Sequence, residues 1–367
     1  MLSDAVAGAR VVVCCGSGGV GKTTVSASLA LALARRGARV AVVTIDPARR
    51  LASALRIAEL GDAPHLVPVD DATGELWALQ LDAKATFDRL VAREAPTEEA
   101  RDQILTNRIY RHLSGAVAGA QEYMAVERLH ELVDEDRYDH VVLDTPPAQN
   151  ALDFLDAPQR IIRFIEGRAL RVLMRPGMKA GALGWRALQA GGAVVLPVLE
   201  RLAGGQLLRD VADFLAGFDG MYAGFRDRAD AVGRLLRSPE ASFVVITGPQ
   251  PEPIWEAVAL WRRLGHDGYP LGGLVVNRVH PLPPARLPSQ DALGAALSAA
   301  GAGDGADLAA RVLATVGEAR ALGIHDLDAL EGLRAALDVP AVVTVPAYPT
   351  DPVDLDGLGR VSRLLLS

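Results

Sequence analysis

The feature that most constrains this chain is a glycine-rich segment near its start, Gly16-Ser17-Gly18-Gly19-Val20-Gly21-Lys22-Thr23, followed by Thr24. Two of its glycines are separated by four residues and followed by Lys and Thr, which is the pattern of a phosphate-binding loop. The apolar residues 11–15 before it predict a buried strand, and the Ala- and Leu-rich residues 25–36 after it predict a helix. Glycines let successive backbone N–H groups curl around a phosphate, and the helix N-terminus adds its positive dipole end. Because pattern and context agree, an ordinary glycine-rich turn is the disfavoured alternative.

Apolar runs of strand length recur along the chain, at residues 11–15, 40–45, 76–81, 141–143, 243–247, 274–276 and 341–345. Helical patterns separate most of them, which predicts an α/β fold with a mostly parallel sheet flanked by helices. Ligands of such sheets bind beyond the carboxyl ends of the strands, where this chain places Gly16, Asp46, Asp82, Asp144, Gly248, Asn277 and Pro346. That row suits a nucleotide site, in which Lys22 is expected to reach the β- and γ-phosphates and the Thr23 hydroxyl to bind Mg²⁺.

Two long intervals are too helical in composition for simple crossovers between strands. We therefore expect a P-loop nucleotide-binding core made of residues 1–83, 138–150 and 241–367, with residues 84–137 and 151–240 forming an inserted helical subdomain. The second interval is rich in Leu, Ile and Met, which favours a packed helical core, with or without a dimer face. The alternative is a groove that binds a hydrophobic segment of another protein.

Composition excludes several other functions. The formal net charge is −7 and no basic run occurs, so nucleic acid is a poor candidate partner. The two cysteines are adjacent in a predicted strand and point to opposite faces, which makes a disulfide between them improbable and indicates a reducing, cytoplasmic setting. The start of the chain has no signal-peptide pattern, and the weakly polar residues 187–199 are too few to cross a bilayer, so we expect no transmembrane segment.

Three further segments carry candidate site residues. Asp46, in Thr-Ile-Asp-Pro-Ala, follows a strand, where a carboxylate can orient water against a γ-phosphate; a simple turn is the alternative. Asp144, in Leu-Asp-Thr-Pro-Pro, ends an apolar run as the expected second acidic partner of Mg²⁺, with a helix cap as the alternative. Asn277, in Val-Asn-Arg with Arg278, offers a donor and an acceptor that match the edge of adenine, or is a strand-end turn residue.

These four segments, in this order, resemble the ArsA family of ATPases, which includes arsenite-pump ATPases and the eukaryotic ATPase that targets tail-anchored membrane proteins. The family belongs with the MinD-like and nitrogenase-iron-protein-like ATPases that carry a deviant Walker A loop. Residues 121–124 and 150–158 are similar to segments of the actinobacterial ArsA-like proteins. The resemblance covers the chain from residue 11 to about residue 346.

The resemblance implies roles for these residues. Lys22 and Thr23 would bind phosphate and Mg²⁺, Asp46 would activate water in the first switch, and Asp144 would lie near Mg²⁺ in the second. Asn277 would read adenine, and Pro346 would begin the segment that flanks the base. Members of the family work as dimers that close over ATP and open after hydrolysis, and a helical subdomain moves as they do so.

The chain departs from the family at Ser17, where a signature lysine usually contacts nucleotide across the dimer. A slow homodimer, a cation from Arg49 or Arg50, and a heterodimer with a lysine-bearing paralogue are the open explanations; the two arginines are otherwise ordinary surface residues. An arsenite site lacks converging thiolates, and without Cys-x-x-Cys or spaced histidines we expect no metal beyond the Mg²⁺ that accompanies ATP or ADP.

The sequence thus predicts a Mg²⁺-dependent ATPase whose cycle drives dimer closure and the handling of a client or partner protein. A nucleotide-gated binding module with negligible turnover, acting as a chaperone or scaffold, is the alternative.

Overall fold

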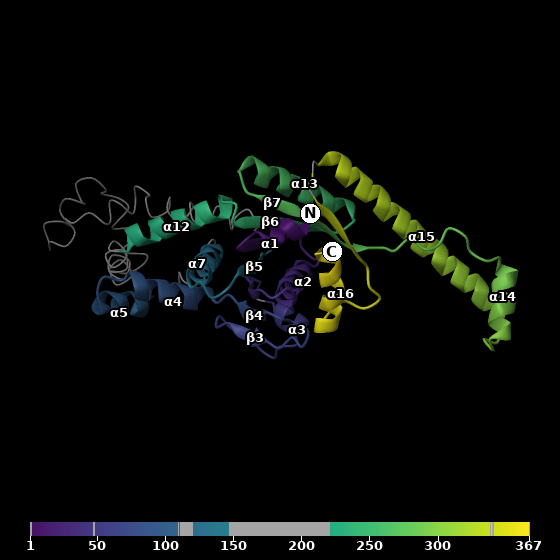
Figure 1. Ribbon diagram of the computed structural model, residues 1–367, viewed down its shortest axis with the longest axis horizontal. Coiled ribbons are helices and arrows are strands. Elements are labelled where there is room, and N and C mark those ends of the chain that lie inside the picture. Colours follow the sequence, from purple (N-terminus) through teal and green to yellow (C-terminus); the bar gives the residue numbers. More distant parts are fainter. Residues whose placement is uncertain are drawn as a thin grey trace, which may run out of the picture.

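The fold is built around one eight-stranded sheet, seen in a computed structural model that describes residues 2–46, 48–108, 110, 120–146, 221–337, 339 and 341–366 (Figure 1). The strand order is β3-β4-β2-β5-β1-β6-β7-β8. The strands are β1 (Val11–Gly16), β2 (Arg39–Thr44), β3 (His65–Val67), β4 (Glu75–Gln80), β5 (His140–Asp144), β6 (Ala241–Thr247), β7 (Leu271–Val279) and β8 (Val342–Pro346). All neighbouring strands are parallel except β3 and β4. The predicted α/β fold with a mostly parallel sheet is therefore confirmed, and all seven predicted strands occur.

Two hydrophobic layers cover the two faces of the sheet. On one face, alternate strand residues such as Val12 and Cys14 pack against α1 (Leu2–Ala7), α2 (Lys22–Arg35), α3 (Arg50–Ala54) and α16 (Leu355–Leu365). On the other face, Val11, Val13 and Cys15 pack against α7 (Ala120–Asp134), α12 (Tyr222–Arg237) and α13 (Pro251–His266). Cys14 and Cys15 lie in different layers and are both free and buried, as the alternation of a strand predicts.

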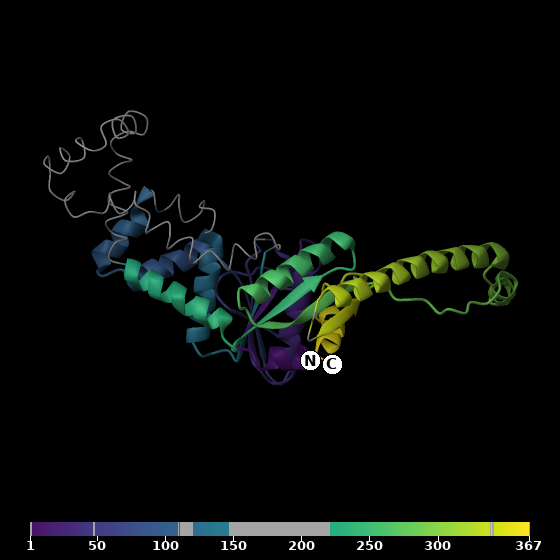
Figure 2. The same ribbon diagram turned by 90° about the horizontal axis from the view of Figure 1, so that it is seen from above.

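At one end of the molecule a group of helices gathers beside the sheet (Figures 1 and 2). Helices α4 (Ala83–Glu94), α5 (Glu98–Thr106), α7 and α12 share a third apolar cluster that includes Leu90, Tyr110 and Met124. Because α7 also packs on the sheet, it joins this cluster to the rest of the fold. The expected helical subdomain of residues 84–137 and 151–240 stays a prediction, since residues 111–119 and 147–220 lie outside the described part of the chain.

At the opposite end, two antiparallel helices inserted between β7 and β8 project away from the sheet (Figures 1 and 2). We call them the helical arm; they are α14 (Gln290–Ala299) and α15 (Gly305–Ala336). The base of α15 packs through Leu330 and Leu333 on the same layer as α13. Of the described helices, even this 32-residue one included, none combines the length and apolar character needed to traverse a bilayer.

Candidate nucleotide-binding site

The phosphate loop occupies the carboxyl end of the central strand β1, and α2 begins directly after it at Lys22. Gly21 lies before the helix with φ 91°, and a Cβ atom there would be 2.3 Å from the Asn277 Nδ2 atom. A Cβ atom on Gly16 would be 1.9 Å from the Ile246 carbonyl oxygen of β6. Gly16 therefore requires glycine because a backbone oxygen lies too close for a Cβ atom. Gly21 requires it because of its left-handed φ, together with the nearby Asn277 side chain.

Three side chains hold carbonyl oxygens of this loop. Lys22 Nζ donates to the Ser17 carbonyl at 2.8 Å, Asn277 Nδ2 donates to the Val20 carbonyl at 2.8 Å, and Arg278 Nη1 donates to the Gly19 carbonyl at 3.1 Å. A carbonyl that already accepts a hydrogen bond repels an entering anion less. These hydrogen bonds thus hold three loop carbonyls in place.

Lys22 is buried, with 8% of its surface exposed. Burial lowers the pKa of Lys22 from its ordinary value, while the nearby Asp144 carboxylate acts in the opposite direction. Among the described residues, Lys22 Nζ donates to one carbonyl, so an anion placed beside it would offset part of the cost of burying the ammonium group.

The Asp144 carboxylate ends β5 and is 1% exposed. It accepts hydrogen bonds from Thr23 Oγ1 at 2.7 Å, Thr44 Oγ1 at 3.0 Å and Ser26 Oγ at 3.4 Å. Burial raises the pKa of Asp144 to about 6, although these three hydroxyls and Lys22 oppose the rise. A carboxylate among hydroxyl oxygens is the donor chemistry that Mg²⁺ prefers.

Asp46 follows β2 on the other side of the loop, and its side chain is 24% exposed. One carboxylate oxygen accepts from the Ala48 backbone N–H at 2.9 Å, and the other lies 3.5 Å from Arg50 Nη1. The Asp46 backbone N–H donates to the Thr44 hydroxyl at 3.3 Å. Thr44 therefore connects the two acidic residues, a role that the sequence analysis missed; a polar residue ending an apolar strand was the available signal.

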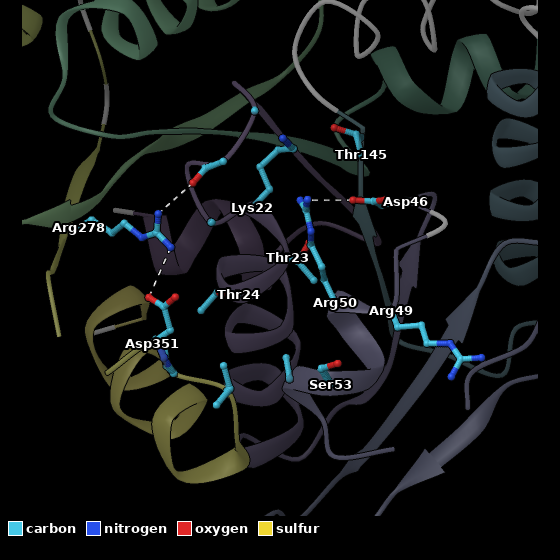
Figure 3. A pocket seen from close by; sticks show the side chains of 16 residues that line it. Lys22, Thr23, Thr24, Asp46, Arg49, Arg50, Ser53, Thr145, Arg278 and Asp351 are labelled. Carbon is cyan, nitrogen blue, oxygen red and sulfur yellow. Dashed lines mark hydrogen bonds and ion pairs between the residues drawn. The ribbon is translucent and has the colours of Figure 1, made fainter. Parts of the chain in front are cut away.

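A cavity of about 650 Å³ lies in front of these groups (Figure 3). It brings together the predicted residues Gly18, Gly19, Gly21, Lys22, Thr23, Thr24, Asp46 and Arg278. Its wall also contains residues that the sequence did not single out, namely Ser53, Ala54, Thr145, Asp351, Pro352 and Val353. The cavity thus joins the phosphate loop to the end of β2, the end of β7 and the segment after β8.

Other predicted residues lie beside the cavity. Asn277 is 6% exposed and uses its amide N–H to brace the loop, so its reading of adenine stays a prediction. Pro346 ends β8 opposite Val279, and it is not among the residues that form the cavity wall within the described chain. Its position flanking a base also stays a prediction.

Ser17 occupies the position at which the signature lysine of the ArsA family is expected. Ser17 is 3% exposed, and its hydroxyl has no hydrogen-bond partner within the described residues. Figure 3 shows Arg50 directed toward Asp46, whereas Arg49 points away from it. Of the two arginines, it is thus Arg50 that lies beside Asp46.

Comparison with known proteins agrees with this geometry. A family model described as anion-transporting ATPase matches residues 9–189. ATPase ARSA2 of Chlamydomonas reinhardtii is 28% identical over 72% of this chain and 66% of its own length. An uncharacterized protein of Streptomyces coelicolor is 34% identical over 53% of this chain and 45% of its own length. ATPase get3 of Neurospora crassa is 32% identical over 39% of this chain and 41% of its own length.

The chain spans less than two thirds of the length of these relatives. Residues 9–189, which match the family model, contain the phosphate loop, Asp46 and Asp144. The eight-stranded sheet, the flanking helices and the loop after β1 have the architecture of a P-loop NTPase. Residues 9–189 form a domain that matches the ArsA family of anion-transporting ATPases.

Proposed function

We propose that the chain binds ATP with Mg²⁺ in this cavity and hydrolyses it. The observation that carries the proposal is the convergence of Lys22, Thr23, Asp46 and Asp144 around one phosphate loop, from three parallel strands and the start of α2. A buried cation, loop N–H groups and two acidic residues are what phosphoryl transfer requires, since its catalysis depends on positioning and charge stabilisation.

The residues present fit a magnesium ion. The Thr23 hydroxyl and the Asp144 carboxylate, 2.7 Å apart, offer hard oxygen donors, and Asp46 offers a second carboxylate near them. When bound together with the nucleotide, Mg²⁺ would neutralise charge on the phosphate oxygens. Thr44 and Ser26 would hold the Asp144 carboxylate in place through their hydroxyls.

In the hydrolytic step, Asp46 is the residue proposed to orient the attacking water. The bond from the water oxygen to the γ-phosphorus forms while the bond to the β,γ-bridging oxygen breaks, which yields ADP and inorganic phosphate. Lys22 and the loop N–H groups meet the charge on the transferred group. The pairing of Arg50 with Asp46 supports the hypothesis that Arg50 supplies part of the charge that a lysine at Ser17 would supply.

We further propose that the nucleotide cycle closes a homodimer, or a heterodimer with a paralogue, and serves a client protein with a hydrophobic segment. The similarity to proteins named ATPase get3 and ATPase ARSA2 supports an assembly of this kind. The helical cluster beside the sheet is the proposed moving part, although residues 151–220, where most of the candidate groove was predicted, lie outside the described chain. The free, buried thiols support a reducing, cytoplasmic setting.

The test is steady-state phosphate release with Mg²⁺ and ATP, in the wild-type chain and in Lys22→Ala, Asp46→Asn and Arg50→Ala. We expect turnover in the wild type, loss of nucleotide binding in Lys22→Ala, and binding without turnover in Asp46→Asn. Nucleotide binding with turnover far below roughly 1 s⁻¹ would instead favour the nucleotide-gated module. Calorimetry that detects no ATP binding would refute both functions.

A further inference from the structure

Arg278 has an unusual backbone conformation at the edge of the cavity. Its φ is 63°, in the left-handed region that residues other than glycine rarely adopt. It lies where the pairing of β7 with β8 shifts register between Val276 and Val279, so β7 carries an extra residue there. Such bulges re-aim a side chain, and strained backbone of this kind gathers at functional sites.

The re-aimed side chain joins two walls of the cavity. Arg278 Nη1 donates to the Gly19 carbonyl at 3.1 Å, and Nη2 lies 3.4 Å from the Asp351 carboxylate. Gly19 belongs to the phosphate loop, and Asp351 belongs to residues 347–354 between β8 and α16. Figure 3 shows this pair on the side of the cavity away from Asp46. The next two residues of the chain, Pro352 and Val353, also line the cavity.

The chain directly after Arg278 is fixed by two hydrogen bonds. Directly after the bulge, the Val279 carbonyl accepts from the Ala347 N–H at 2.8 Å, which resumes the pairing with the segment after β8. The His280 backbone N–H donates to Asp326 Oδ2 at 2.7 Å, and Asp326 is a buried residue of α15. These contacts keep the left-handed conformation in place, so the direction of the Arg278 side chain is preset.

We propose that Arg278 is a positioning residue that clasps the phosphate loop to residues 347–354 and thereby slows the release of nucleotide from the cavity. The inference rests on the proposed binding of nucleotide there, and adds what sets the nucleotide's residence time. Arg278 donates to the Gly19 carbonyl and leaves the loop N–H groups available to a phosphate. The contact is therefore compatible with nucleotide bound in the loop. It closes the end of the cavity remote from Asp46, which a nucleoside diphosphate and a triphosphate occupy alike.

The expected effect on the rate of nucleotide release follows from how exposed the Arg278–Asp351 ion pair is. The Arg278 side chain is 51% exposed and that of Asp351 is 70% exposed, so their ion pair is weak and screened by salt. The hydrogen bond to Gly19 adds a contribution of similar size. Together they predict that loss of the clasp speeds nucleotide release roughly three- to tenfold.

The experiment measures dissociation of a fluorescent ADP analogue by stopped flow, with excess unlabelled ADP as the chase. Arg278→Asn is the main variant, because Asn tolerates the left-handed region and keeps the bulge foldable, and Arg278→Ala and Asp351→Asn accompany it. We expect faster release in both Arg278 variants, a smaller increase in Asp351→Asn, and unchanged association rates. Raising the salt concentration should move the wild-type release rate toward that of Arg278→Asn.

Arg56→Ala is the matched control. Arg56 also has a positive φ, of 55°, and also forms an ion pair with the segment after β8, 2.8 Å from Asp354, but it does not line the cavity. Its release rate should match that of the wild type. A change of less than about twofold in Arg278→Asn, an effect confined to association, or an equal effect in Arg56→Ala would overturn the clasp. Failure of the wild type itself to bind the analogue would refute the proposed function instead.

Discussion

At the scale of single residues, hydroxyl groups organise the acidic side of the cavity. Thr44 is 1% exposed and connects Asp144 with the backbone of Asp46. The sequence predicts both aspartates as site residues because each ends an apolar run. It did not mark Thr44, because a threonine in a strand is most often there for its β-branched shape.

We predict that Thr44→Val lowers turnover more than nucleotide affinity. Valine keeps the shape but removes the donor to a buried carboxylate, which is worth roughly 1.5–3 kcal/mol, or about ten- to a hundredfold in rate. Phosphate-release kinetics together with nucleotide titration would separate the two quantities. Thr247→Val, at the end of β6, is the control, because its buried hydroxyl donates to the Gly248 carbonyl and, in the described part of the chain, to no carboxylate. Equal turnover in the two variants would contradict the role of Thr44.

The thiols of β1 give a prediction about pH. Burial raises the pKa of Cys15 to about 12, with Lys22 opposing, and raises that of Cys14 well above its ordinary value. The fold thus favours the neutral thiols, so their contribution to stability is full below about pH 9 and is lost as the pH rises toward 12. At pH 8 we expect a disulfide reagent to label native protein only as fast as it unfolds.

The control for this labelling is Ala302→Cys, which places a thiol at the exposed turn between α14 and α15. The introduced thiol should react at once in native protein. Unfolding in guanidinium should expose Cys14 and Cys15 to the reagent. Rapid labelling of Cys15 in the folded wild type would show that the thiol is accessible and the burial argument wrong.

At the scale of elements, the unit of β1, loop and α2 was the most predictable part of the chain. The contacts that require glycine in this loop are not visible in the sequence. Gly21, for example, lies beside Asn277, which belongs to a strand more than 250 residues further along the chain. β3 escaped prediction because it has three residues on an antiparallel edge, with Leu66 exposed. A helical stretch after residues 301–305 was predictable, but its projection from the sheet as the helical arm was not, because α15 shows no continuous apolar stripe that would tell which part of it packs on the core.

We predict that Gly21→Ala abolishes nucleotide binding and destabilises the fold. The added Cβ atom would lie 2.3 Å from Asn277 Nδ2 and would force alanine into φ 91°. Gly268→Ala is the matched control, since Gly268 has φ 77° with nothing within 4 Å of the added atom. Denaturant unfolding should show a loss of about 1 kcal/mol for the control and a clearly larger loss for Gly21→Ala. Equal losses would mean that the contact with Asn277 has no effect.

At the scale of the whole molecule, an ionic network joins the sheet to the helical cluster. Glu131 of α7 accepts from Arg128 at 2.9 Å and from Arg89 of α4 at 3.2 Å. Arg89 Nη1 also lies 2.5 Å from Asp62, in the segment that leads from α3 to β3. The chain that follows Asp46 is thus tied to the helices through charges that no sequence pattern pairs.

We predict that Glu131→Gln destabilises the protein by roughly 1–3 kcal/mol, because Arg89 and Arg128 lose a buried carboxylate partner, although Asp62 remains beside both. Lys84→Ala removes the more exposed pair with Asp88 and should change stability by less than about 1 kcal/mol. Chemical denaturation of both variants provides the measurement. Similar midpoints for the two would show that burial adds nothing to the network.

The helical arm has a practical consequence for probing this molecule. Its turn carries Gly301 and Gly303 with open space around both, at the far end of a 32-residue helix that spans roughly 48 Å. The arm departs from β7 just beyond Arg278 and returns through β8 to the segment that contains Asp351. A reporter protein inserted between these glycines would be connected through the arm to the two walls of the cavity that contain Arg278 and Asp351. It would itself lie far from the cavity.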